Sequence, residues 1–168
     1  IGGEMAEHPG LMHAGEFELV GFSVGVVDKH EMITRESVTP DDVIIGLHSP
    51  GLRSNGYSLA RKVLFDTAKK SIHDPVWDGT DVTVGEELLR PSVIYTPTVL
   101  KVLEQNQVKA IAHITGGGLP GNVNRVLPDD MDAEIRKKTW SPPRIFTEIQ
   151  SLGNIDEGEM FKVFNICL

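Results

Sequence analysis

The chain has 168 residues, of which 40% are hydrophobic and 24% charged, and its formal net charge is −8. These values predict one folded domain with a real core and argue against a fibrous or disordered protein. The acidic balance opposes nucleic-acid binding, which depends on neutralising phosphates. The single cysteine, Cys167, excludes a disulfide framework and a cysteine-based zinc site, and it favours a cytoplasmic location.

Neither a membrane span nor a secretory leader is expected. No apolar run approaches the roughly 20 residues that a bilayer requires, and no charged-then-apolar stretch opens the chain. The sequence starts without a methionine inside a glycine-rich turn, and it stops within an apolar run at residues 161–168. We therefore expect a piece of a longer protein, cut at both ends.

Four segments have patterns typical of β-strands. Residues 16–33 are rich in β-branched and aromatic side chains, and residues 41–49 form an apolar run after a Thr-Pro turn. In residues 108–115 the side chains alternate between two faces, one of them wholly apolar from Val108 to Ile114. Residues 132–138 are also strand-like. These patterns predict a β-sheet.

Helical spacing recurs between and after these segments. In residues 55–70, Leu59, Val63, Leu64 and Ala68 share one face, and lysines lie near the end, where they favour the helix dipole. Mixed strands and helices without strict alternation predict an α+β fold, a mixed sheet with packed helices, in one domain over residues 1–168. The other predicted helices are residues 84–92, 95–106, 119–127, 143–153 and 156–164.

The stretch HITGGGLPGN, residues 113–122, places three glycines between a predicted strand and a predicted helix with Pro120 near its first turn. Backbone N–H groups at the start of a helix suit a phosphate when no side chain shields them. The pattern is neither a P-loop nor a dinucleotide fingerprint. A tight turn that needs positive φ and binds nothing explains Gly116, Gly117 and Gly118 equally well.

A second glycine-containing helix entry lies at residues 49–62. Ser54 or Asn55 would cap the helix, and Gly56 would let a ligand approach its first turn. Arg53 could hold a phosphate through two hydrogen bonds. An ordinary N-cap beside a solvated arginine is the alternative. Two such entries in one small acidic chain favour an anionic ligand.

Two residues are candidates for proton transfer or other catalytic work. Glu4 lies in GGEMAEHPG, residues 2–10, and carboxylates near a phosphate act through Mg²⁺ or by receiving protons. His113 precedes the glycines. The alternatives are a polar loop for Glu4 and a hydrogen-bonded core histidine for His113. No metal ligand can be assigned from the sequence.

GGEMAEHPG, GFSVGVVDK, LRSNGYSLARKVL, LLRPSVIY and AIAHITGGGLPGNVNRVLP, in this order and at these separations, resemble the phosphoribosylformylglycinamidine cyclo-ligase family (aminoimidazole ribonucleotide synthetase). The resemblance covers essentially the whole chain. It implies the C-terminal domain of such an enzyme, with residues 1–12 as the junction from an absent ATP-binding domain and with the extreme C-terminus also absent. It implies the family's α+β fold with a mixed sheet.

The resemblance further implies ATP-dependent ring closure of formylglycinamidine ribonucleotide to aminoimidazole ribonucleotide in purine biosynthesis. ATP and Mg²⁺ would be required, the full-length protein would be a cytoplasmic homodimer, and this fragment alone would be inactive. A non-catalytic folded fragment and another ATP-dependent member of the same superfamily remain the alternatives. The expected substrate- or phosphate-binding residues are Arg53, Ser54, Asn55, Gly56, Thr115, Gly116, Gly117, Gly118 and Asn122.

Three positions depart from the family pattern. Arg53 stands where members often carry histidine, so it would hold an anion rather than transfer a proton. Met5 and His8 replace the commoner threonine and methionine. A hydroxyl contact at residue 5 is therefore not expected.

Overall fold

The computed structural model describes residues 15, 21 and 24–164. The chain divides into two compact units, residues 1–32 and residues 33–168. The described part of the first unit is irregular apart from a turn at Gly15 and one 3₁₀ turn, η1, at Lys29–Glu31. The predicted strand at residues 16–33 lies partly outside the described residues, and residues 24–28 form no strand.

The described part of the second unit is built from helices and loops. Short 3₁₀ turns precede or follow several of the α-helices, and one turn of π-helix, η3, continues α1. The elements, in chain order, are η2 (Arg35–Ser37), α1 (Tyr57–Arg61), η3 (Lys62–Thr67), α2 (Val84–Leu88), α3 (Thr96–Gln105), α4 (Gly118–Val123), η4 (Asn124–Val126), η5 (Lys137–Thr139), α5 (Arg144–Gly153) and α6 (Glu157–Phe164).

All six helices predicted from apolar spacing are present, with small differences at their ends. The helix predicted over residues 55–70 begins at Tyr57 and becomes π-helical at Lys62, where the Ala68 N–H reaches back five residues to the Val63 carbonyl at 2.8 Å. At the end of α5, Asn154 rather than Gly153 adopts the left-handed conformation that closes the helix.

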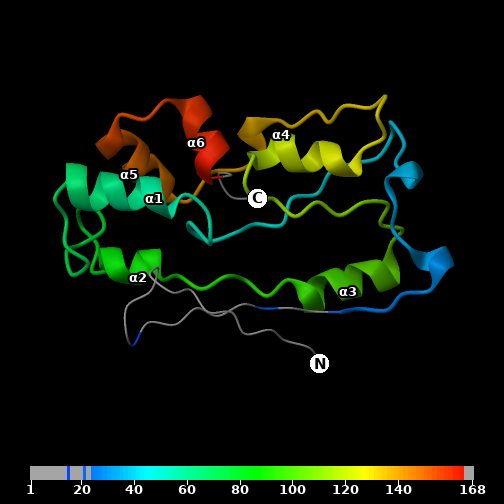
Figure 1. The fold of residues 1–168 in the computed structure, drawn as a ribbon, viewed down its shortest axis with the longest axis horizontal. Coiled ribbons are helices and arrows are strands. Elements are labelled where there is room, and N and C mark those ends of the chain that lie inside the picture. The colour runs from blue at the N-terminus through cyan, green and yellow to red at the C-terminus, as the bar shows by residue number, and fades with distance from the viewer. Residues whose placement is uncertain (1–14, 16–20, 22–23, 165–168) are drawn as a thin grey trace. The chain divides into compact units, whose positions relative to one another are not determined.

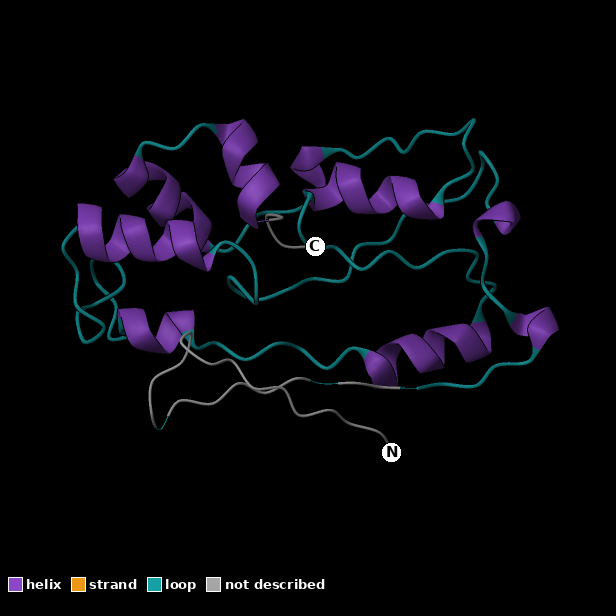
Figure 2. Cartoon of the chain, viewed as in Figure 1, coloured by secondary structure: helices purple, strands orange, loops and turns teal. Residues whose placement is uncertain are grey.

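The predicted mixed sheet is not confirmed. Within residues 24–164 no β-strand forms, as Figure 2 shows for the described chain, and one isolated bridge pairs Pro75 with Thr83. Residues 41–48 are exposed, with Val43 at 82% and Ile45 at 79%, and residues 108–115 and 132–136 are loops. A strand exists only when a second strand pairs with it, so local β-propensity alone did not decide these segments.

The hydrophobic core lies where α1, η3, α5 and α6 pack together (Figure 1). Ile145, Phe146 and Ile149 fall three and four residues apart on α5, so this amphipathic helix buries one side. Phe146 meets Phe164 of α6 edge to face, with ring centroids 5.6 Å apart. The other buried members of this core are Leu52, Ala60, Val63, Leu64, Val76, Val84, Leu88 and Met160.

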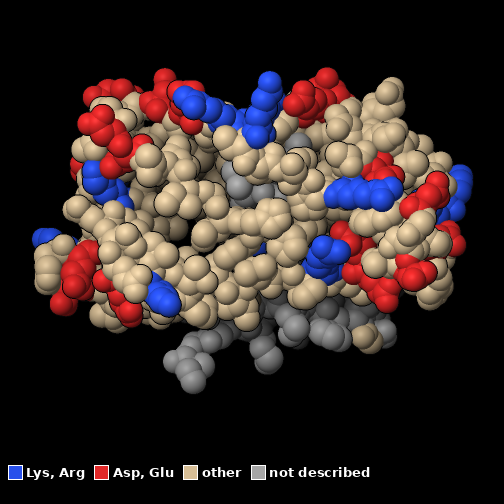
Figure 3. Space-filling view, turned by 180° about the vertical axis from the view of Figure 1, so that it is seen from behind, with Lys and Arg blue, Asp and Glu red and all other residues tan. Residues whose placement is uncertain are grey.

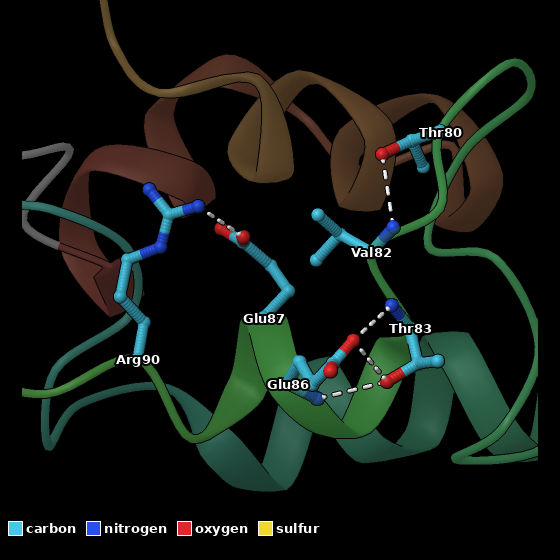
Figure 4. A network of polar contacts seen from close by, with 6 residues as sticks. All are labelled: Thr80, Val82, Thr83, Glu86, Glu87 and Arg90. Carbon is cyan, nitrogen blue, oxygen red and sulfur yellow. Dashed lines mark hydrogen bonds and ion pairs between the residues drawn. The ribbon is translucent and has the colours of Figure 1, made fainter.

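The start of α2 is fixed by a capping box (Figure 4). The Thr83 hydroxyl accepts a hydrogen bond from the Glu86 N–H at 3.2 Å, and the Glu86 carboxylate accepts one from the Thr83 N–H at 2.8 Å. These two bonds satisfy backbone donors that the helix itself cannot. The capping box therefore defines where this five-residue helix begins.

Candidate functional site

The glycine-rich turn before α4 has the backbone conformation that the sequence predicts. Gly117 has φ of 99° and Gly118 has φ of 67°, and the Gly118 N–H closes the turn on the Thr115 carbonyl at 3.1 Å. Side chains disfavour such positive φ values, so glycine is needed at both positions. A Cβ added at Gly116 would meet nothing within 4 Å, and one at Gly117 would meet only the Gly121 Cα at 3.8 Å. The turn therefore has open space on one side.

Asn122 determines the shape of this turn from the inside. Its side chain is 3% exposed, and its Nδ2 donates to the carbonyls of Gly118 at 2.8 Å, Thr115 at 3.1 Å and Gly116 at 3.4 Å. Its Oδ1 accepts hydrogen bonds from the Thr115 hydroxyl at 3.2 Å and from Arg125 at 3.3 Å. Because both ends of the amide are engaged, Asn122 is a support of the turn rather than a contact for a ligand.

The orientation of these carbonyls fixes the direction of the neighbouring N–H groups. In a trans peptide the carbonyl of one residue and the N–H of the next point in opposite directions. The Thr115 and Gly116 carbonyls turn toward Asn122, so the N–H groups of Gly116 and Gly117 point away from it. Neither N–H has an acceptor among the residues that the structure describes. Together they form a pair of free donors beside open space.

His113 and Thr115 lie just before this turn. His113 is exposed, so the alternative of a core histidine is wrong, and its imidazole makes no hydrogen bond with any described residue. The Thr115 hydroxyl is engaged with Asn122 inside the turn. Glu4, the other candidate catalytic residue, lies outside the described residues.

The second predicted entry, before α1, differs from the sequence interpretation. Gly56, with φ of 78°, occupies the N-cap position, and neither Ser54 nor Asn55 makes a side-chain cap. A Cβ at Gly56 would lie 2.3 Å from Cδ1 of Phe164, the last residue of α6. The space that was predicted to admit a ligand at Gly56 is therefore occupied by an aromatic ring of the core.

Arg53 is the charged residue of this second turn. It is half-buried and has the left-handed φ of 60°, and its Nη1 donates to the Ser49 hydroxyl at 3.2 Å and to the Tyr95 hydroxyl at 3.3 Å. No carboxylate pairs with it among the described residues. Because 42 residues separate Tyr95 from Arg53, no local sequence pattern connects them.

The two turns are related through α6. This helix packs against α4, which follows the first turn, and its Phe164 contacts Gly56 in the second. Among the described residues, no hydrogen bond or ion pair joins the two turns. Among the residues that the structure describes, no group of three His, Cys, Asp or Glu side chains could hold a metal ion.

A surface hollow of about 610 Å³ lies elsewhere, over α2 and the segments on either side of it, and contains none of the predicted site residues. Glu87 in its wall is 2% exposed and pairs with Arg90 at 2.7 Å (Figure 4). Burial raises the pKa of Glu87, and the Arg90 guanidinium opposes that rise. Since the hollow shares no residue with either turn, it adds nothing to the candidate site.

The Glu87 carboxyl leads to a prediction on stability. Its folded pKa lies above the unfolded value of 4.5, so the native state binds its proton more tightly. The stabilisation that Glu87 gives the folded state is complete below pH 4.5. It is lost as the pH rises through the folded pKa. Glu87→Gln should remove that decline from urea-unfolding curves measured across pH. Glu86→Gln is the control, because hydrogen bonds from Thr83 lower the pKa of Glu86 and so give the opposite pH dependence. If stability changed with pH in the same way in both variants, the raised pKa of Glu87 would be contradicted.

The face of the molecule drawn in Figure 3 has no dominant basic patch. On the side shown in Figure 3, Lys and Arg lie among Asp and Glu. That distribution suits a small anion held locally better than a long polyanion. The expected absence of nucleic-acid binding stays a prediction. None of the helices among the described residues is long and apolar enough to span a membrane.

The described part of the second unit is thus helix-rich, and the glycine turn before α4 presents two backbone N–H groups beside open space, an arrangement of the kind that suits a small anion. A family model described as "AIR synthase related protein, C-terminal domain" matches residues 39–165. The chain belongs to this family, which confirms the resemblance drawn from its motifs.

Similarity to individual relatives extends beyond the matched domain. The chain is 51% identical over 166 residues to a phosphoribosylformylglycinamidine cyclo-ligase of Brevibacillus brevis and 44% identical to one of Alkaliphilus metalliredigens, covering 99% of this chain and 48% of each relative. One of Geobacter metallireducens is 50% identical over 165 residues. The chain spans about half the length of these curated relatives.

Proposed function

We propose that this chain is the C-terminal part of an ATP-dependent cyclo-ligase that converts formylglycinamidine ribonucleotide to aminoimidazole ribonucleotide in purine biosynthesis. The family match supports this, together with relatives of that name across nearly the whole chain. The structural observation that carries the proposal is the pair of free N–H donors at Gly116 and Gly117. A homodimer of the full-length protein and a cytoplasmic location belong to the same proposal.

The reaction would proceed in two steps. The γ-phosphoryl group of ATP would pass to the formyl amide oxygen, releasing ADP, and an amidine nitrogen would then attack the activated carbon, closing the imidazole and expelling phosphate. Both steps develop charge on phosphoryl oxygens, and fixed backbone donors stabilise such charge. The N–H groups of Gly116 and Gly117 would hold one phosphate oxygen, and Arg53 would neutralise a second anionic group.

The other predicted residues would have smaller roles in the reaction. The exposed imidazole of His113 would exchange a proton with the substrate, and Glu4 would receive one from the attacking amidine. Ser54, Asn55, Gly56 and Thr115 would shape the surroundings of Arg53 and of the glycine turn. Mg²⁺ accompanies ATP in this proposal; among the described residues no group of three His, Cys, Asp or Glu side chains could hold it.

A chimera tests the proposed activity. In it, this chain replaces the matched 166 residues of the Brevibacillus brevis relative. We expect ADP release that depends on formylglycinamidine ribonucleotide, with none from the 168-residue chain alone. ADP release with a different acceptor would favour another ATP-dependent activity. A folded chimera that releases no ADP with any acceptor would favour a non-catalytic fragment.

Gly116→Ala tests whether the glycine turn meets the ligand. Its Cβ would enter open space and its φ is not in the left-handed region, so folding should be unaffected. The same methyl group would stand where an anion approaches the N–H donors, and we expect kcat/KM of the chimera to fall at least about tenfold, as for loss of one oxyanion donor.

Gly121→Ala is the matched control for this change. That position is also open, but it lies within α4, and its own N–H is already bonded to the Gly117 carbonyl at 3.3 Å, so it is not one of the free donors. Steady-state kinetics and thermal unfolding of both variants should show equal stability and unequal activity. Equal kcat/KM for the two variants would show that the turn does not contact the ligand.

A further inference from the structure

Tyr95 connects the start of α3 with the turn that carries Arg53. Its hydroxyl donates to the His48 carbonyl at 2.8 Å and accepts from Nη1 of Arg53 at 3.3 Å. Its ring lies under the same guanidinium, with 5.6 Å between the Arg53 Cζ and the ring centroid. A cation over an aromatic face at this distance is attracted by the ring. Tyr95 therefore holds Arg53 through its hydroxyl and through its ring.

The neighbours of Arg53 leave its positive charge uncompensated. Its hydrogen-bond partners, the hydroxyls of Ser49 and Tyr95, are neutral, and no carboxylate pairs with it among the described residues. Its Nε is buried and has no partner in the described part of the chain. A guanidinium that no carboxylate neutralises keeps its charge available for a charge-assisted bond to an anion.

The backbone at Arg53 is also unusual. A non-glycine residue at φ of 60° costs about 1 kcal/mol relative to ordinary conformations. Such strain persists only where surrounding contacts stabilise it. The contacts to Ser49 and Tyr95 act on the side chain and fix its direction. The turn is therefore built to hold this guanidinium in one place.

We propose that Tyr95 is a positioning residue that holds Arg53 to bind a phosphate-class anion. The inference rests on the proposed function, because it takes the anion to be a phosphoryl group of ATP or the phosphate of the ribonucleotide. Tyr95 does not itself contact the ligand. Its whole effect on binding is exerted through Arg53, and this makes the proposal testable with a pair of substitutions.

The first test is a double-mutant cycle on the 168-residue chain with inorganic phosphate as the probe, measured by calorimetry or NMR titration. Arg53→Met should weaken phosphate binding at least about tenfold, since it removes a charge-assisted bond. Tyr95→Phe should weaken it about fivefold, since the hydroxyl that anchors Arg53 to the His48 carbonyl is lost while the ring remains. In the Arg53→Met background, Tyr95→Phe should add nothing.

Tyr57→Phe is the matched control for this cycle. Tyr57 is the other tyrosine, it is also half-buried, and its hydroxyl likewise donates to a backbone carbonyl, that of Leu88, but it does not contact Arg53. It should leave phosphate affinity unchanged. Unchanged affinity in Tyr95→Phe, or the same loss with and without Arg53, would overturn the proposal. So would a wild-type chain that does not bind phosphate.

The second test identifies the anion and separates this inference from the proposed function. In the chimera, Tyr95→Phe should raise the KM for ATP alone if Arg53 holds the nucleotide, or the KM for the ribonucleotide alone if it holds the substrate, with kcat little changed. Unchanged values of both would overturn the positioning role although the enzyme is active. The chimera could be inactive while the double-mutant cycle with phosphate gives the predicted result. That outcome would refute the proposed activity and leave the positioning role supported.

Discussion

Gly56→Ala is expected to lower the free energy of unfolding by roughly 2–4 kcal/mol, the sum of left-handed backbone strain and overpacking. The new methyl carbon would lie 2.3 Å from Cδ1 and 2.4 Å from Cε1 of Phe164, well inside contact distance. The ring cannot move aside freely, because it is 3% exposed and packs edge to face against Phe146. Urea unfolding of the 168-residue chain measures the loss.

Gly79→Ala separates the two contributions. Gly79 has the same φ of 78° as Gly56, but a Cβ there would meet nothing within 4 Å. It should cost only about 1 kcal/mol, the backbone strain alone. The difference between the two variants is the free energy of the clash with Phe164. Equal losses would show that α6 does not pack over the start of α1 as described.

Removing the ring provides an independent check. Phe164→Ala alone should destabilise the chain by about 3–5 kcal/mol, because it leaves a cavity in the core. In that background the added cost of Gly56→Ala should fall to the value for Gly79→Ala, since the clashing atoms are gone. If the free-energy losses of Phe164→Ala and Gly56→Ala were additive in the double variant, a direct contact would be contradicted. Residues in contact give non-additive losses.

The helices were predictable because their signals are local. Apolar residues three and four apart, as at Leu59 and Val63, indicate a helix without knowledge of its neighbours. Local signals also overpredicted strands: the run at residues 43–47 is apolar and β-branched, yet a strand needs a pairing partner that no local pattern specifies. The Gly56 to Phe164 contact was missed for the same reason, since 108 residues separate the two positions.

The candidate site was predictable in its backbone and not in its side chains. Three consecutive glycines indicate a turn with positive φ and free N–H groups, and the structure has both at Gly117. Asn122 was among the expected ligand-binding residues, but in the structure its amide bonds the turn's own carbonyls, which no sequence pattern specifies. Tyr95 was missed entirely, because a tyrosine distant in sequence carries no signal of the arginine it contacts.

Asn122→Ala should destabilise the chain by roughly 2–3 kcal/mol, because it removes the hydrogen bonds that the buried amide makes with the carbonyls of Gly118 and Thr115 and with the Thr115 hydroxyl. Asn122→Asp sharpens the test, because aspartate keeps the shape but replaces the donating Nδ2 by an oxygen that faces the carbonyls of Gly118 and Thr115. An ionised carboxylate there has no donor to offer, so the folded state should favour the protonated form and raise the pKa of Asp at this position.

The sign of the pH dependence follows from that raised pKa. The Asn122→Asp chain should be most stable at acidic pH, where the carboxyl can still donate one hydrogen bond, and should lose stability as the pH rises from about 4 to about 7. Asn124→Asp is the matched control, because Asn124 is exposed, lies two residues further along and makes no side-chain hydrogen bond among the described residues. Its unfolding curves should follow wild type at every pH. If Asn122→Asp did so too, Asn122 would not hold the glycine turn, and the outward direction inferred for the Gly116 and Gly117 N–H groups would lose its physical cause.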